Sequence, residues 1–191
     1  MELWRRWQAE RAGREQASAF VRALLVDPPE ADVQRLAAIG TGGDADHARW
    51  ELRYVRRAAG MLAAQRDALD DRTASLVSSA LARALRRDPG VAAARRDVAA
   101  RQFNVRLSAY ADALVEKNGP EGTGDRLGRV LLGFAGRLDP TPSELEGAGA
   151  IVTAFLAEAS EALRRSFGAA ALPEDVAPSE IKAGDQRSAI S

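Results

Sequence analysis

The sequence predicts an all-α protein: an irregular helical bundle of about six helices, with an amphipathic N-terminal helix and an extended C-terminal tail. Three observations support this fold class. Apolar residues recur at helical spacing through most of the chain, whereas strand-type alternation is nearly absent. Alanine, the strongest helix former, is abundant. Proline and glycine clusters separate the periodic stretches from one another.

The first region, residues 1–43, is expected to hold a long helix, a short helix and a glycine-rich joint. An apolar stripe runs along residues 2–26 and consists of Leu3, Trp7, Ala17, Val21, Leu24 and Leu25. The two prolines at 28 and 29 end this helix, because proline cannot continue it. Residues 31–39 form a short helical piece. The joint Gly40-Thr41-Gly42-Gly43 follows, and Asp44 is a candidate N-cap for the next helix.

The second region, residues 44–168, is expected to be the core of the bundle. Apolar residues at helical spacing indicate helices over 46–69, 76–85, 91–117, 127–138 and 145–163. A linker signal rich in glycine makes 118–125 a possible boundary within this core.

The third region, residues 169–191, is a tail with two prolines, four acidic residues and few apolar groups. Such a composition does not bury enough apolar surface to fold alone. We expect this acidic tail to lie along a partner and to become ordered on binding.

Composition excludes several classes of function. The chain of 191 residues has no cysteine and one histidine, so it has no disulfide, no thiolate metal site and no site with several histidines. No apolar run approaches the roughly 20 residues that span a membrane. No apolar signal segment follows the N-terminus. We therefore expect a cytoplasmic protein. It could also lie at the cytoplasmic face of a membrane.

His47 is the only candidate for imidazole chemistry. It stands among Asp44, Asp46 and Glu51, but no Glu-x-x-His pair for a di-metal bundle site is present. The two aspartates are explained as a helix cap and as favourable charges at a helix N-terminus. The chain shows no serine-hydrolase motif and no P-loop lysine after the glycine joint, and Met61 is placed on an apolar face. We therefore expect no enzyme activity, no cofactor and no metal. The alternative is an enzyme or a small-ligand-binding protein that uses His47.

A second alternative is a helical regulator that binds nucleic acid. Net charge is zero overall, but residues 49–106 carry +7, from thirteen arginines and six acidic residues. Nucleic-acid binders usually have a basic domain with a recognition motif, and here acidic residues interleave and no motif stands out. Nucleic acid is therefore not the partner we favour.

Glycines leave the surfaces of the predicted helices 127–138 and 145–163 without side chains at several positions, which would let these two helices approach closely. Packing between them within the chain is the favoured interpretation, and docking of another subunit is the alternative.

The N-terminal helix carries the most suggestive feature. Trp7 lies on its apolar stripe, whereas Trp4 lies about 100° around the helix from the stripe, beside arginines. Trp4 either packs on a neighbouring helix or anchors a partner or a membrane face, since tryptophan and arginine are enriched at such contacts. The candidate interface residues are Trp4, Arg5, Trp7, Arg11, Arg49, Arg53 and Arg56.

These observations favour a non-enzymatic accessory or scaffolding subunit whose partners are other protein subunits of a larger assembly. One expected host is a membrane-embedded energy-transducing complex, respiratory or photosynthetic, on which the chain would sit peripherally. The sequence resembles no known family at the level of motifs.

Overall fold

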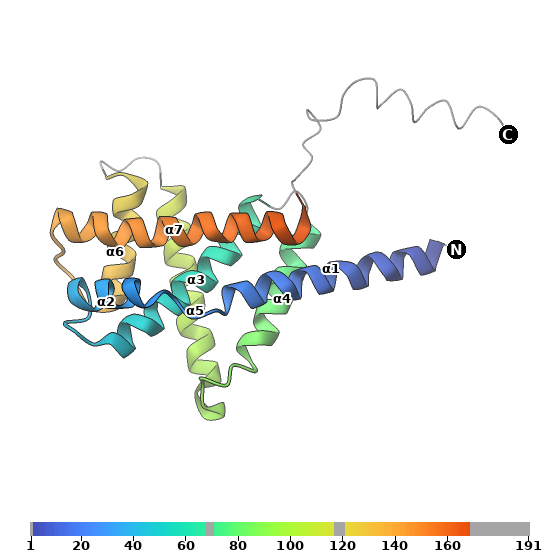
Figure 1. Cartoon of the computed structure of the whole chain (residues 1–191), viewed down its shortest axis with the longest axis horizontal. Coiled ribbons are helices and arrows are strands. Elements are labelled where there is room, and N and C mark those ends of the chain that lie inside the picture. The colour runs from blue at the N-terminus through green and yellow to red at the C-terminus, as the bar shows by residue number, and fades with distance from the viewer. Residues whose placement is uncertain (1, 68–70, 117–120, 169–191) are drawn as a thin grey trace, which may run out of the picture.

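The computed structural model describes residues 2–67, 71–116 and 121–168, except for the side chains of residues 2, 3 and 6. This part of the chain contains seven α-helices, one 3-10 helix and no strand (Figure 1), so the predicted all-α class is confirmed. The helices are α1 (Glu2–Leu24), α2 (Glu30–Ile39), α3 (Ala45–Asp67), α4 (Asp71–Leu85), η1 (Ala93–Arg95), α5 (Arg96–Val115), α6 (Thr123–Ala135) and α7 (Pro142–Phe167). The predicted tail, residues 169–191, lies outside the described residues.

Helix α3 is the centre of the bundle and packs against each of the other six α-helices. Its residues 57–64 are buried on every side, although they include Arg57. Alanines and one glycine dominate this stretch, and small side chains allow neighbouring helices to approach from several directions. The apolar core accordingly surrounds α3, with Phe20 of α1, Leu36 of α2, Leu131 of α6 and Phe155 of α7 fully buried against it.

Helix boundaries follow local signals in the sequence. The Asp44 carboxylate accepts a hydrogen bond of 2.9 Å from the backbone N–H of His47, which confirms Asp44 as the N-cap of α3. Thr141 and Glu144 form a reciprocal capping box at the start of α7, with Pro142 as its first residue. The predicted helix 91–117 is instead divided into η1 and α5, because its first residues form a 3-10 turn.

Helices α6 and α7 cross at glycines, which confirms the predicted packing within the chain. A Cβ atom on Gly128 would lie 2.3 Å from the carbonyl oxygen of Leu145, and one on Gly149 would lie 2.3 Å from the carbonyl oxygen of Gly124. No side chain fits at either position, so the backbones of the two helices touch. Gly133, on another face of α6, meets nothing within 4 Å.

Helix α1 is anchored along one half only. Its buried residues begin at Ala17 and continue with Phe20, Val21 and Leu24. The N-terminal half extends past the other helices, as the blue ribbon in Figure 1 shows. We call residues 2–16 the α1 arm.

Candidate functional site

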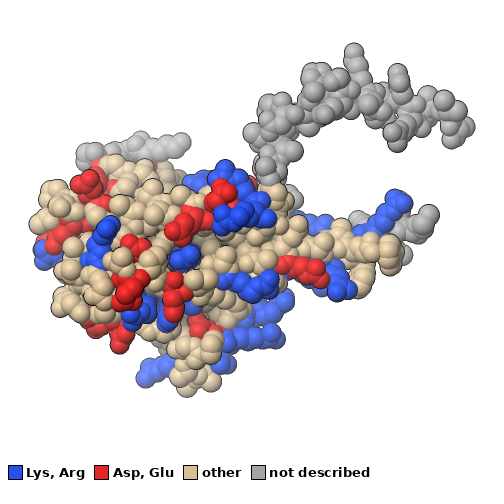
Figure 2. All heavy atoms as spheres, viewed as in Figure 1, with Lys and Arg blue, Asp and Glu red and all other residues tan. Residues whose placement is uncertain are grey.

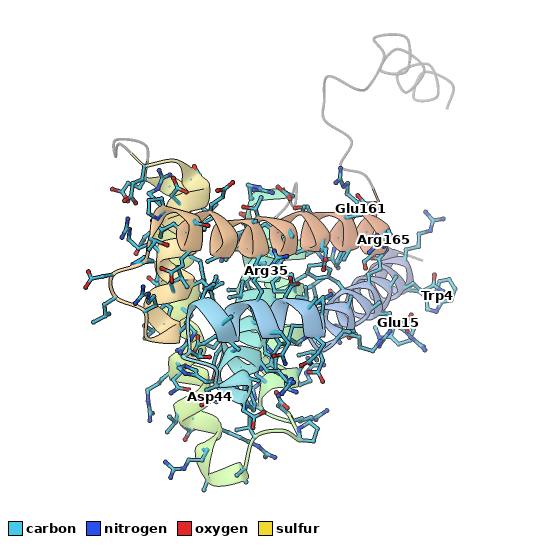
Figure 3. The ribbon with its side chains drawn as sticks, turned by 60° about the vertical axis from the view of Figure 1, so that its left-hand side comes forward. Trp4, Glu15, Arg35, Asp44, Glu161 and Arg165 are labelled. Atoms are coloured by element: carbon cyan, nitrogen blue, oxygen red, sulfur yellow. The ribbon has the colours of Figure 1, made fainter. Side chains whose placement is uncertain are left out.

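The α1 arm exposes two tryptophans. The side chains of Trp4 and Trp7 are 63% and 56% accessible, among the most exposed large apolar residues of the described chain. Trp4 points away from the body at the outer end of the helix (Figure 3). Of the two interpretations of Trp4, packing inside the isolated fold is therefore wrong. Trp7 continues the apolar stripe of α1 as predicted, but no other helix of the described chain extends far enough to cover it.

Helical geometry places the two tryptophans on one side of the arm. Trp4 and Trp7 are three residues apart, and Arg11 follows four residues later, so the three side chains are neighbours along the helix. The guanidinium of Arg11 lies 5.9 Å from the centre of the Trp7 ring, within cation–π range. Arg5 is exposed one position beyond Trp4. The arm therefore presents an aromatic surface bordered by arginine.

Two local ion pairs add a little stability to the helix of the arm. Arg11 pairs with Glu15 at 3.0 Å, and Arg14 pairs with Glu10 at 3.1 Å. Exposed pairs at this spacing each contribute only about 0.3–0.5 kcal/mol, so the anchored half of α1 supplies most of the helical order. Gly13 marks the transition, because a Cβ there would lie 3.0 Å from Leu76 of α4.

The other predicted interface arginines face inward. Arg49 pairs with Glu30 of α2 and with Asp46, both at 3.0 Å, and Arg53 pairs with Asp27 at 2.7 Å. Arg56 pairs with Glu158 of α7 at 3.2 Å. Their side chains are only 17–29% exposed. The structure does not bring these three residues together with Trp4 and Trp7, and it uses their charges to join α3 to its neighbours.

Glu30 shows the electrostatic effect of this pairing. Hydrogen bonds from Gln34 and then from Arg49 lower the pKa of its carboxyl group. Acidic and basic side chains are interspersed over the face of the body that Figure 2 shows.

His47 lies beside a buried ion pair that the sequence analysis did not identify. Glu51 of α3 and Arg106 of α5 are 3% and 9% exposed, and Arg106 Nε donates to Glu51 Oε2 at 2.7 Å while its NH2 group donates to Oε1. The guanidinium lies between the rings of Tyr54 and Phe134, 4.6 and 4.5 Å from their centres. His47 Nε2 approaches Glu51 Oε1 at 3.5 Å.

Electrostatics favour the charged form of Arg106. Burial, the largest single effect, acts to lower the pKa of its guanidinium, but the hydrogen bonds to Glu51 and the charge of Glu51 together outweigh burial, so the net pKa is raised. Burial raises the pKa of Tyr54, whose hydroxyl donates to Gln102 Oε1 at 3.0 Å. Glu51, Arg106 and Tyr54 thus each have a structural partner.

An open groove of about 520 Å³ leads to His47 and Glu51. It is lined by the aromatic rings of Trp50 and Tyr54, by Arg95 and by small apolar residues of α5 and the preceding turn. None of its lining residues is a serine, threonine, cysteine or lysine that could act as a nucleophile. In the described ranges, no three histidine or acidic side chains are close enough together to hold a metal ion.

None of the helices in the described ranges is both long and apolar enough to cross a bilayer. No family model, curated protein or solved structure matches the chain. Only the geometry of the chain therefore indicates a site, and the exposed tryptophans make the α1 arm the candidate.

Proposed function

We propose that the chain is a non-enzymatic accessory or scaffolding subunit that docks on a larger assembly through the α1 arm. The observation that carries the proposal is the exposure of Trp4 and Trp7, at 63% and 56%, on a helix that extends beyond the body. Tryptophan is costly to leave in water, and each ring buries roughly 150–250 Å² when covered. Two neighbouring rings are therefore a strong anchor for a partner.

The partner is a protein with an apolar groove. A helix with anchors three residues apart fits such a groove, in which the rings enter and the arginines meet the rim. An anionic membrane surface is less well matched, because helices that bind it have a strongly basic polar face. In the arm, Glu10 and Glu15 neutralise Arg14 and Arg11.

The body serves as the base of this arm. Its interior is apolar apart from the ion pairs of Glu51 and Arg57, and α1 is held in it by Phe20 and Leu24. Residues 169–191, with their acidic character, would add a second contact along the partner. The proposal extends to the expected host, a membrane-embedded energy-transducing complex on which the chain lies peripherally.

Separation of native extract by size, with the chain followed by mass spectrometry, tests the proposal. The wild-type chain is expected in a large complex, and a double variant, Trp4→Ala with Trp7→Ala, is expected near its own 20.4 kDa. Leu138→Ala is the matched control, because Leu138 is 81% exposed but lies in the loop between α6 and α7. Equal migration of the double variant and the wild type would refute docking through the arm.

The nucleic-acid alternative receives less support from the same contacts. Within 49–106, many of the arginines form ion pairs inside the chain: Arg49, Arg53, Arg56, Arg57, Arg66 and Arg106. Charges neutralised in this way contribute little to phosphate binding.

A further inference from the structure

A second cavity lies between α3, α4 and α5. It is on a different face of α3 from the one that contacts Leu24 of α1. Its volume is about 300 Å³. Voids in well-packed interiors rarely exceed one water molecule, and ligand pockets begin at roughly 300 Å³. The floor is apolar and is formed by Met61 of α3, Leu81 and Leu85 of α4, and Phe103 and Leu107 of α5.

Two of the charged side chains that line the cavity are already paired with each other. Arg57 and Asp88 form an ion pair at 2.7 Å, and their side chains are 7% and 14% exposed. The other oxygen of Asp88 accepts the backbone N–H of Gly90 at 2.9 Å. Because these two side chains neutralise each other, this part of the lining leaves no net charge for a ligand.

Another part of the cavity lining carries an unsatisfied donor. Arg96, the first residue of α5, lines the cavity, and its Nε atom is inaccessible to solvent and has no hydrogen-bond partner. Buried donors in native proteins nearly always have an acceptor, so the Arg96 guanidinium has hydrogen-bonding capacity that no described residue uses. Arg86 also lines the cavity, and neither arginine forms an ion pair with the residues that the structure describes.

From this geometry we infer that the cavity binds a small amphipathic anion. The apolar body of the ligand lies on the floor between Met61 and Phe103, and its carboxylate accepts hydrogen bonds from Arg96. A guanidinium pairs with a carboxylate through charge-assisted hydrogen bonds, which are the strong kind.

The charge around the entrance favours an anion over a cation. Arg86, just after the end of α4, and Arg96, at the start of α5, both line the cavity. Asp97 is the one acidic lining residue besides the paired Asp88, and it is exposed. Basic residues therefore outnumber unpaired acidic ones at the entrance, and their field attracts negative ligands. This inference does not depend on the arm and would stand if docking through the arm failed.

Calorimetric titration of the purified full chain with octanoate tests the inference, with 1-octanol as the neutral ligand of the same length. Octanoate is expected to bind saturably at one site per chain and at least about tenfold more tightly than octanol, since a charge-assisted pair is lost with the neutral ligand. Absence of octanoate binding, or equal binding of the two ligands, would overturn the inference.

Three variants locate the site. Arg96→Gln should weaken octanoate by at least about tenfold, and Arg101→Gln, an exposed neighbour outside the cavity, should not change it. Ala100→Trp places a large ring at the rim, where Ala100 is exposed, and should abolish binding. Circular dichroism confirms that each variant is folded. Full binding by folded Ala100→Trp, or by folded Arg96→Gln, would show that the ligand binds elsewhere.

Discussion

At the residue scale, the Tyr110 hydroxyl is, with Arg96 Nε, a buried polar atom that has no hydrogen-bond partner among the described residues. Tyr110 is 2% exposed, its hydroxyl makes no hydrogen bond, and burial raises its pKa far above the ordinary value. Removing an unsatisfied buried group costs no hydrogen bond and relieves its desolvation. Tyr110→Phe should therefore leave the free energy of unfolding unchanged or raise it by up to about 1 kcal/mol. Urea denaturation measures this change.

Tyr54→Phe is the matched control for this prediction. The Tyr54 hydroxyl does have a partner, Gln102, so its removal should lower the free energy of unfolding by about 1 kcal/mol. Equal losses in the two variants would show that Tyr110 has an acceptor in solution.

The buried pair of Glu51 and Arg106 gives a second prediction. Glu51→Gln leaves the Arg106 charge buried without its counter-ion, which should lower the free energy of unfolding by about 3–5 kcal/mol. Replacing both members, Glu51→Leu with Arg106→Met, should recover most of this loss, because apolar side chains of similar size often substitute for a buried pair. A double variant no more stable than Glu51→Gln would contradict a purely structural role.

Asp67 makes part of the stability depend on pH. Hydrogen bonds from the Arg66 guanidinium, and then from the Ser160 hydroxyl of α7, hold the pKa of its carboxyl group below the ordinary value of 3.8. Because the folded-state pKa is the lower one, the stabilisation is complete above the unfolded-state pKa. It is lost as the pH falls through the folded-state pKa.

Asp67→Asn should accordingly destabilise the chain at pH 7, by about 1 kcal/mol, and the difference from wild type should shrink as the pH approaches 3. Thermal unfolding between pH 7 and pH 3 checks the trend. Asp139→Asn, at an exposed position without an ion-pair partner in the described ranges, should change little at any pH. A constant difference for Asp67→Asn across this range would refute the assignment.

At the scale of elements, the close crossing of α6 and α7 predicts that two glycines of α6 respond differently to substitution by alanine. Gly128→Ala drives a methyl group into the backbone of α7 and should lower the free energy of unfolding by about 1–3 kcal/mol. Gly133→Ala meets open space and should raise it by about 0.5–1 kcal/mol, because alanine is the better helix former. Denaturant unfolding of the two variants should thus give shifts of opposite sign, and shifts of the same sign would exclude the close crossing.

Most of the helices could be predicted because their signals are local. The Asp44 cap, the prolines after α1 and the apolar spacing of α3 all lie within a few residues of the boundaries they set. The periodicity also predicts which face of α3 is apolar, but not what covers the opposite face. Arg49, Arg53 and Arg56 are predicted as interface residues, but the structure covers them with acidic partners from the turn before α2, from α2 and from α7.

At the scale of the whole molecule, the sites that escaped prediction depend on contacts distant in sequence. Glu51 and Arg106 are 55 residues apart, and no spacing rule joins them. The cavity with Arg96 likewise forms only where α3, α4 and α5 meet. The position of Trp4 off the apolar stripe is predictable, because it depends only on local helical spacing. Its exposure depends on how far the body extends beside α1, which no local pattern determines.

Hydrogen exchange of the α1 arm, compared between the isolated chain and the chain purified in its native assembly, tests the central claim most directly. In the isolated chain the outer part of the arm lies beyond the other helices, so the amides of residues 2–12 should exchange far faster than those around Phe20. In the assembly, a partner that covers Trp4 and Trp7 should slow exchange in the arm while leaving α3 unchanged. Equally fast exchange of the arm in both states would contradict docking through these two tryptophans.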